Sequence, residues 1–242
     1  MFPNHEGQPA PHATLTALID GKPTPIPSAE LFGPGRTVVV FALPGAFTPT
    51  CSSAHVPRYE ELSAALRKAG VDEIVCLSVN DAFVMDAWSR DQGAQHIRFL
   101  ADGNGEFTDA MGLLVDKSAI GFGKRSWRYS MLVRDGVIEK QFIEPDLPGD
   151  PYQVSDADTM LAYLAPTLAK QPDVLLFTKQ GCGHCRRAKA ALAEANQPFH
   201  EVPATPGMLR AVSTEPLTPR VFIDGQLIGG ADELTAWIAR RA

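Results

Sequence analysis

Two apolar segments, each followed by a short loop and then by a cysteine at the expected start of a helix, constrain the fold of this chain most strongly. The first segment is residues 37–43, which precede Cys51, and the second is residues 174–178, which precede Cys182. Around both, short apolar segments alternate with longer ones whose apolar residues recur every three or four positions. This alternation is typical of an α/β protein, in which helices flank a central sheet.

The first 168 residues are expected to form one domain. Residues 1–36 are rich in proline and glycine, which predicts a short hairpin or an irregular lead-in. Pro57 should kink the first long helix, and Ser155 is a good N-cap for the last one. The pattern predicts a mixed central sheet that is mainly parallel, with an antiparallel hairpin at its edge. We expect strands at 37–43, 73–79, 97–100, 129–133 and 137–143, helices at 51–69, 81–92, 107–112 and 155–168, and a loop at 115–126.

Residues 169–242 show a similar order on a smaller scale. Residues 165–172 contain two prolines that should interrupt a helix, so we place the domain boundary between residues 168 and 169. No repeat at the level of individual residues relates the two domains. The second domain is predicted to have strands at 174–178 and 199–202, a hairpin at 220–228, and helices at 182–195, 206–213 and 232–241.

Charge and hydropathy exclude several classes of partner. The formal net charge is −6 and basic residues are nowhere concentrated, which argues against a nucleic-acid partner. No apolar run approaches the ~20 residues of a membrane-spanning helix, and residues 1–6 lack the features of a secretory signal. We therefore expect a cytoplasmic protein without a membrane partner, whose four cysteines serve catalysis or metal binding rather than a disulfide scaffold.

Cys51 has a position and neighbours that suit a reactive thiol. At a helix N-terminus, unpaired backbone N–H groups and the helix dipole stabilise a thiolate. Pro44 and Pro49 stiffen the preceding loop, and the Thr48 hydroxyl can hydrogen-bond to the sulfur and to a substrate oxygen. The alternative is a buried cysteine with a structural role, which is a common situation.

The spacing of Pro44, Thr48 and Cys51 resembles the peroxidatic motif of the peroxiredoxins, and residues 52–57 resemble the type-five branch. This resemblance implies a thioredoxin-like domain whose cysteine attacks peroxides and becomes a sulfenic acid. It also implies an arginine on a later strand that stabilises the departing oxygen. We assign that arginine to Arg128, with Arg125 as the fallback.

Many type-five enzymes carry a second, resolving cysteine after a Glu-Pro-Asp sequence. Here residues 144–146 have that sequence, but residues 147–155 contain no cysteine. Cys76 lies within an apolar strand and is expected to be structural. The first domain is therefore expected to lack a reductant of its own.

Cys182 and Cys185 form a C-x-x-C pair after an apolar strand. This is a strong redox signal, because the first sulfur is exposed at a helix N-terminus and the second lies one turn inside. A zinc site is the alternative, since His184 is also a competent ligand. No second C-x-x-C or pair of histidines follows, so we expect no metal.

Residues 173–242 resemble a glutaredoxin, through the sequences at 178–179, 217–225 and 228–232. The resemblance implies a second, minimal thioredoxin-like domain, in which Cys182 is the nucleophile and the bond before Pro219 is cis. Gly183 and His184 depart from the usual glutaredoxin pair and match that of protein disulfide isomerases. The resemblance assigns glutathione contacts to Lys179, His184, Thr218, Pro219, Gly230, Ala231 and Asp232.

The whole chain resembles the peroxiredoxin–glutaredoxin fusions of bacteria. The resemblance implies a glutathione-dependent thiol peroxidase for hydrogen peroxide and alkyl hydroperoxides, in which Cys182 removes a glutathionyl group from Cys51. Glutathione is then a co-substrate, no cofactor is bound, and Cys185 permits a dithiol variant. Two other functions fit the same motifs: a disulfide isomerase, suggested by Cys-Gly-His-Cys, and a redox sensor that signals through Cys51.

The short linker bears on assembly. Residues 165–172 span at most about 26–29 Å when extended, which constrains exchange between the two centres of one chain. Type-five peroxiredoxins tend to pair. We therefore expect a homo-oligomer, a dimer or tetramer, in which the second domain of one chain serves Cys51 of its neighbour.

Overall fold

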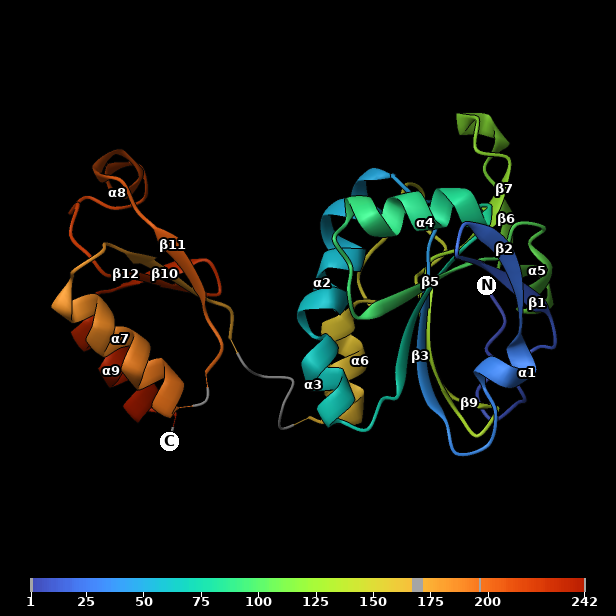
Figure 1. Cartoon of the computed structure of the whole chain (residues 1–242), viewed down its shortest axis with the longest axis horizontal. Helices are drawn as coiled ribbons and strands as arrows, with labels where there is room; N and C mark the ends of the chain where they lie inside the picture. The colour runs from blue at the N-terminus through green and yellow to red at the C-terminus, as the bar shows by residue number, and fades with distance from the viewer. Residues whose placement is uncertain (1, 167–171, 196, 242) are drawn as a thin grey trace. The chain divides into compact units, whose positions relative to one another are not determined.

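The computed structural model describes residues 2–166, 172–195 and 197–241. The chain separates into two compact units, Met1–Ala169 and Lys170–Ala242 (Figure 1). Each unit combines a sheet with helices and has a hydrophobic core of its own. The predicted boundary between residues 168 and 169 lies outside the described residues.

A seven-stranded mixed sheet forms the centre of the first unit. Its strands lie in the order β2 (Lys22–Pro27), β1 (Thr14–Ile19), β5 (Ile97–Ala101), β4 (Glu73–Ser78), β3 (Thr37–Ala42), β8 (Tyr129–Arg134) and β9 (Val137–Ile143). The pairs β3–β4 and β4–β5 are parallel, whereas β1–β2, β1–β5, β3–β8 and β8–β9 are antiparallel. The sheet is mixed, as predicted, but the prediction that it would be mainly parallel was wrong, because the proline-rich lead-in forms a hairpin that extends the sheet beside β5.

Helices cover both faces of this sheet (Figure 1). One face carries α2 (Val56–Glu61), α3 (Ser63–Lys68), α4 (Ala82–Asp91) and α6 (Ala157–Leu164), and the other carries α1 (Ser28–Leu31) and α5 (Glu106–Ala110). The strand β3 shows why: Val39 and Phe41 pack into the core on the first face, while Val38 and Val40 pack into the core on the second. A continuous apolar run is what a strand needs when both its faces are buried.

The helix predicted at 51–69 is divided into three parts. A π-helical turn, η1 (Cys51–His55), precedes α2, and Leu62 separates α2 from α3. Pro57 has no N–H to donate to the carbonyl four residues before it, and its ring crowds that carbonyl. The Val56 N–H accordingly bonds to the Cys51 carbonyl, five residues back. The predicted irregularity at Pro57 is confirmed, but the single long helix was wrong.

The N-cap predicted for the last helix of this unit was also wrong. Asp156 caps α6, since its carboxylate accepts a hydrogen bond of 2.8 Å from the Thr159 N–H. The Ser155 hydroxyl donates instead to Glu144 at 2.7 Å. The helix ends at Leu164. It was predicted to continue to residue 168, but residues 167 and 168 lie outside the described residues.

Residues 115–126, predicted as a loop, contain regular structure. They include most of a two-stranded sheet, β6 (Leu114–Asp116) and β7 (Lys124–Ser126), and a 3₁₀ turn, η2 (Ser118–Ile120).

The second unit follows its predicted order closely. Its sheet has the strand order β11 (His200–Pro203), β10 (Val174–Thr178), β12 (Arg220–Ile223) and β13 (Gln226–Gly229), with β10 and β11 parallel. The helices are α7 (Gly183–Glu194), α8 (Pro206–Val212) and α9 (Ala231–Ala239). Apolar residues of β10, β12, α7 and α9 form its core.

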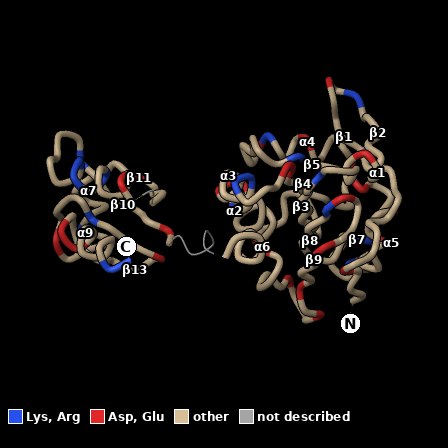
Figure 2. The backbone as a smooth tube through the Cα atoms, turned by 90° about the horizontal axis from the view of Figure 1, so that it is seen from below, with Lys and Arg blue, Asp and Glu red and all other residues tan. Residues whose placement is uncertain are grey.

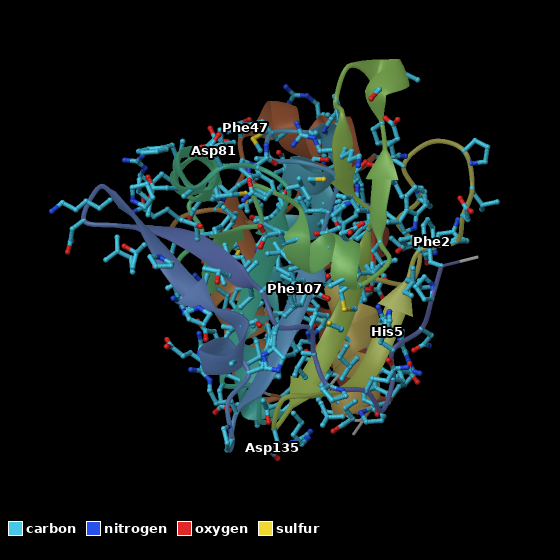
Figure 3. All side chains as sticks on the ribbon, turned by 90° about the vertical axis from the view of Figure 1, so that its right-hand side faces the viewer. Phe2, His5, Phe47, Asp81, Phe107 and Asp135 are labelled. Carbon is cyan, nitrogen blue, oxygen red and sulfur yellow. The ribbon has the colours of Figure 1, made fainter. Side chains whose placement is uncertain are left out.

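The parallel strands of the first unit place their following loops at one edge of the sheet. Phe47, which follows β3, and Asp81, which follows β4, lie at that edge, and Asp135 in the β8–β9 turn lies at the opposite end (Figure 3). The loop that leads to Cys51 starts where β3 ends. Loops at the carboxyl ends of parallel strands are a frequent place for ligand sites in α/β proteins.

Charged residues of both signs are interspersed over each unit (Figure 2). Among the described residues, no helix combines the length and the apolar character needed to cross a membrane.

Candidate active sites: two thiol centres

Cys51 is a free, fully buried thiol in η1, beside a buried arginine. Its Sγ accepts a hydrogen bond of 3.5 Å from Nη2 of Arg128, which immediately precedes β8 and is 1% exposed. The fallback candidate, Arg125 in β7, donates instead to the carbonyls of Phe122 and Val79. The structure thus brings the first of the two predicted arginines to the cysteine.

The donors of Arg128 are divided among three side chains. Nη1 lies 3.0 Å from Nδ1 of His55, and Nη2 donates both to Cys51 and to the carboxylate of Asp150, whose oxygens lie 2.5 and 2.6 Å away. Burial acts to lower the pKa of Arg128, but the Cys51 sulfur and Asp150 outweigh it and raise that pKa. The guanidinium is therefore a permanent cation beside the sulfur.

His55 lies four residues after Cys51 and holds the guanidinium from the other side. Its Nε2 is 3.2 Å from the Ser155 carbonyl, which can only accept, so Nε2 carries the proton and Nδ1 accepts from Arg128. Burial, and then the charge of Arg128, keep the pKa of His55 well below its usual value. The ring also packs against Phe41 and Tyr152, with centroids 4.8 and 4.9 Å away. A neutral imidazole in this position accepts a hydrogen bond from Arg128 and so orients the guanidinium. It adds no second positive charge beside it.

The loop before Cys51 is arranged differently from the prediction in one respect. The Thr48 hydroxyl donates to the Gly45 carbonyl at 2.8 Å, and the predicted bond to the Cys51 sulfur is not among its contacts within the described residues. The hydroxyl oxygen keeps lone pairs that can accept a hydrogen bond from a hydroperoxide. Pro44 is buried at the end of β3, and Phe47 has a positive φ of 61°, which is uncommon for an aromatic residue.

A buried carboxylate anchors the loop that carries Asp150. Glu144 is 1% exposed and accepts hydrogen bonds from the backbone N–H groups of Gln153, Val154 and Ser155. These bonds, with the one from the Ser155 hydroxyl, bring the two ends of residues 145–152 together. Asp150, near the tip of the loop, reaches back to Arg128.

Cys76 lies in β4, fully buried, opposite Phe41 of β3. Burial raises the pKa of its thiol well above the usual value. A cysteine in this environment is un-ionised at neutral pH and behaves as a small apolar residue, as expected from the sequence.

Cys182 is the N-cap of α7 and is partly exposed, unlike Cys51. Its Sγ accepts from the Cys185 backbone N–H at 3.3 Å and from the Thr218 hydroxyl at 3.6 Å. Partial burial acts to raise the pKa of Cys182, but hydrogen bonds from Cys185 and Thr218 outweigh it and lower that pKa. Burial raises the pKa of Cys185. Cys182 is therefore the better nucleophile of the pair, and the bond between Thr218 and Pro219 is cis, as predicted.

Besides Thr218 and Pro219, the residues predicted to bind glutathione form three groups in the second unit. Lys179 is exposed and lines a cavity of about 430 Å³ together with Cys182, and His184 is exposed in the first turn of α7. Gly230 packs against the cis-proline, since a Cβ on it would lie 3.6 Å from the Pro219 carbonyl.

The third group is the start of α9, where the N–H groups of Ala231 and Asp232 have no partner within the helix. The Asp232 carboxylate accepts from Arg187 at 2.6 Å, although both side chains are largely exposed. No group of three or more His, Cys, Asp or Glu side chains that could hold a metal occurs among the described residues.

Comparison with known proteins decides the family. The Redoxin family model matches residues 5–161 and the Glutaredoxin model matches residues 174–228. The chain is 52% identical to the hybrid peroxiredoxin hyPrx5 of Haemophilus influenzae over 97% of its own length and 98% of that protein. This chain belongs to the hybrid peroxiredoxins. It is a peroxidase of the oxidoreductase class with a fused glutaredoxin domain, as its sequence predicted.

Solved structures agree with this assignment for the first domain of the hybrid peroxiredoxin. Reduced Prx3 from Vibrio vulnificus in complex with hydrogen peroxide is 46% identical, with a TM-score of 0.62 over 66% of this chain and 98% of that one. The 1-Cys peroxiredoxin of Plasmodium falciparum is 33% identical, with a TM-score of 0.62 over 66% of this chain and 97% of that one. Both domains of the hybrid peroxiredoxin are thus α/β units with mixed sheets flanked by helices.

Three residues at the Cys51 centre of this hybrid peroxiredoxin had no role predicted from the sequence. His55 could have been found, because a spacing of four residues places it one helical turn from Cys51. Glu144 and Asp150 gave no such signal, since their contacts depend on how the loop between β9 and α6 folds back on the sheet.

Proposed function

We propose that this hybrid peroxiredoxin reduces hydrogen peroxide and alkyl hydroperoxides at Cys51 and that glutathione, acting through Cys182, restores the thiol. One observation carries the proposal: the Cys51 sulfur is buried 3.5 Å from a guanidinium nitrogen of Arg128. A cation held there favours both a sulfur anion and an oxygen that gains negative charge. The Vibrio vulnificus relative, whose structure contains hydrogen peroxide, supports the choice of substrate.

The oxidation step follows from this geometry. The Cys51 thiolate attacks one peroxide oxygen, the O–O bond breaks, and the departing oxygen leaves as water or an alcohol after taking up a proton. Arg128 stabilises the charge that develops on that oxygen, and Thr48 accepts a hydrogen bond from the hydroperoxide. Pro44, buried just after β3, forms the wall of the site on that side. The product on Cys51 is a sulfenic acid.

Reduction needs a thiol from outside the first domain, because Cys76 is buried and un-ionised. A glutathione thiolate attacks the sulfur of the Cys51 sulfenic acid and water leaves, which gives a mixed disulfide. Cys182 then attacks the glutathionyl sulfur and releases the Cys51 thiolate. A second glutathione regenerates Cys182 as glutathione disulfide departs, so the electrons come from the co-substrate and no bound cofactor is needed. Cys185 can alternatively displace the glutathionyl group from Cys182 and form a disulfide with it.

Glutathione recognition is proposed for the groups around Cys182. Lys179 pairs with the glycyl carboxylate, and the N–H groups of Ala231 and Asp232, which follow Gly230, receive the γ-glutamyl carboxylate. The Asp232 carboxylate, now paired with Arg187, would share its charge with the ammonium group. The Thr218 main chain, fixed next to Pro219, pairs with the tripeptide backbone, and His184 lies at the rim.

Assembly and location are part of the same proposal. A homo-oligomer, either a dimer or a tetramer, would allow the glutaredoxin domain of one chain to serve Cys51 of another. A cytoplasmic location agrees with four free cysteines and with a reaction that consumes reduced glutathione.

Intact-mass analysis after one equivalent of peroxide, and then limiting glutathione, tests the scheme. We expect Cys51→Ser to take up no oxygen, and Cys182→Ser to retain a glutathionyl group that the wild-type chain removes. If Cys182→Ser cleared the adduct as fast as the wild type, glutathione would not act through this thiol.

Exchange between chains has a separate test. A mixture of Cys51→Ser and Cys182→Ser chains should recover glutathione-dependent turnover if domains serve one another in trans. A mixture that stayed inactive, although each variant assembles normally, would contradict the oligomer proposal.

A further inference from the structure

One nitrogen of Arg128 donates to two acceptor groups at once. Nη2 lies 3.5 Å from the Cys51 sulfur and 2.5 and 2.6 Å from the two oxygens of Asp150. Nη1 is engaged with His55. Nε is buried and has no hydrogen-bond partner among the described residues. The shorter and stronger bonds of Nη2 therefore go to Asp150 rather than to the thiol.

The Asp150 carboxylate thus occupies the guanidinium donors nearest to the reacting sulfur. A peroxide that reacts with Cys51 needs an N–H donor directed at the oxygen that gains charge. As long as both oxygens of Asp150 are bound to Nη2, that donor is largely taken, and the carboxylate is also an unfavourable neighbour for a developing oxygen anion.

The attachment of Asp150 permits it to leave. Its side chain is 39% exposed, whereas Arg128 is 1% exposed, so the carboxylate reaches the buried cation from the solvent side. The loop is fixed at its base by Glu144, and Asp150 lies next to Gly149, whose φ is 95°. The tip can turn outward while the base, β9 and α6 keep their bonds.

We propose that Asp150 is the resting occupant of the oxygen-binding position on Arg128, and that a peroxide displaces its carboxylate from Nη2 before Cys51 reacts. This inference rests on the proposed function, because it gives Arg128 the role of stabilising the peroxide oxygens. Asp150 is then a positioning residue that sets how readily Arg128 accepts the peroxide. It also sets how strongly the positive charge of Arg128 favours the Cys51 thiolate.

The charge balance gives the direction of the effect. Among the described residues, the other titratable groups that interact with Arg128 are the side chains of His55, Cys76 and Tyr152. All three are neutral near pH 7, because burial raises the pKa of Cys76 and Tyr152 and lowers that of His55. The charges of Arg58, Asp156 and Asp158 act on Tyr152, so Arg128, with Asp150 bound to it, is the charged group that contacts Cys51. Loss of the Asp150 charge leaves the cation uncompensated and favours the thiolate.

Asp150→Asn tests the proposal in the full-length chain, since the amide keeps the size of the side chain and an oxygen acceptor. Peptide-resolved alkylation over a pH series should show a lower midpoint for Cys51 than in the wild-type chain. The rate constant for one turnover with hydrogen peroxide at neutral pH should rise by about threefold or more. An unchanged midpoint would overturn the proposal, and so would a raised midpoint with slower oxidation, because Asp150 would then hold Arg128 in place.

Two further variants separate charge from structure. Asp150→Glu keeps the charge and should restore the wild-type midpoint, and a midpoint like that of Asp150→Asn would contradict the proposal. Asp146→Asn removes an exposed carboxylate of the same loop that forms no hydrogen bond or ion pair with any other described residue, and it should leave both measurements unchanged. Failure of the proposed function would appear separately, as a wild-type chain that does not reduce peroxide at all.

Discussion

The two thiol centres surround a reactive sulfur with different groups. Cys51 is fully buried, and a side-chain cation 3.5 Å away compensates for the lost water. Cys182 is partly exposed, and a backbone N–H and a hydroxyl suffice. The difference matches the size of the proposed partners: a peroxide needs little space at a buried sulfur, whereas a tripeptide such as glutathione would need an open cavity, like that beside Lys179.

This contrast predicts that the two centres respond differently to loss of charge. Replacing Arg128 with Gln should lower the rate constant of Cys51 with hydrogen peroxide by about 10²–10³-fold, because the donor to the departing oxygen is lost. Stopped-flow oxidation measures this, and deglutathionylation of a separate peptide by Cys182 should be unaffected. Arg128→Lys should not restore the rate, since one ammonium cannot serve both Cys51 and His55 in a planar arrangement. Arg125→Gln is the control, and an equally large loss there would contradict the contrast.

The open centre should depend on charge for binding rather than for chemistry. Lys179→Ala should raise KM for a glutathionylated peptide by about tenfold, the loss of one charge-assisted contact, with kcat little changed. Steady-state assays measure both values. Arg210→Ala, which removes an exposed cation of α8 in the same unit, is the matched control. A fall in kcat alone would show that Lys179 acts on the thiol instead.

The Cys182 centre can be examined further through pH. The pKa of Cys182 is lowered in part by the side chain of Cys185, whose own pKa is raised by burial. Cys182 should therefore be alkylated at a pH below that of an ordinary cysteine, and Cys185→Ala should move its midpoint upward by less than about one unit, since the backbone N–H remains. The Cys51 peptide in the same digest is an internal control. Earlier alkylation of Cys185 than of Cys182 would reverse the assignment of the nucleophile.

The smallest expected effect concerns the stability of the buried centre. The folded state keeps His55 neutral, with a pKa well below the value of 6.5 expected in the unfolded chain. Below that pH, His55 is protonated in the unfolded chain but stays neutral in the folded chain. The free energy of unfolding therefore falls as pH decreases, by at most about 1.4 kcal/mol per pH unit. His55→Gln should reduce this dependence.

Urea unfolding at pH values of about 7.5 and about 5.5 measures this pH dependence of the free energy of unfolding. Fluorescence of Trp88 and Trp127, in a Trp237→Phe background, reports on the first unit. His12→Gln, which changes an exposed histidine, is the control. An equal pH dependence in all three proteins would mean that His55 is not held neutral by its surroundings.

The sequence predicted what depends on local pattern. Apolar runs identified β3 and β10, the cysteine spacings identified both centres, and the glutaredoxin signature anticipated the cis bond at Pro219. Arg128 was predicted because the resemblance to the peroxiredoxins implies an arginine on a strand that follows the cysteine motif.

The sequence did not show which polar groups form hydrogen bonds with residues far away in the chain. Ser155 is a good N-cap by type, yet Glu144 takes its hydroxyl and leaves the cap to Asp156. The contact of Asp150 with Arg128 joins residues 22 positions apart through a loop whose path no local preference determines. A hairpin was one of the two alternatives for the lead-in, but the pairing of β1 beside β5 was not predicted.

The way Glu144 gathers three successive amides has an evolutionary consequence. A loop closed at its base by one residue is a module, whose length and outermost residue can vary while the flanking strand and helix stay in place. In this chain a carboxylate, Asp150, lies near the tip of the loop. The same closure would let another residue take that place without rebuilding the sheet.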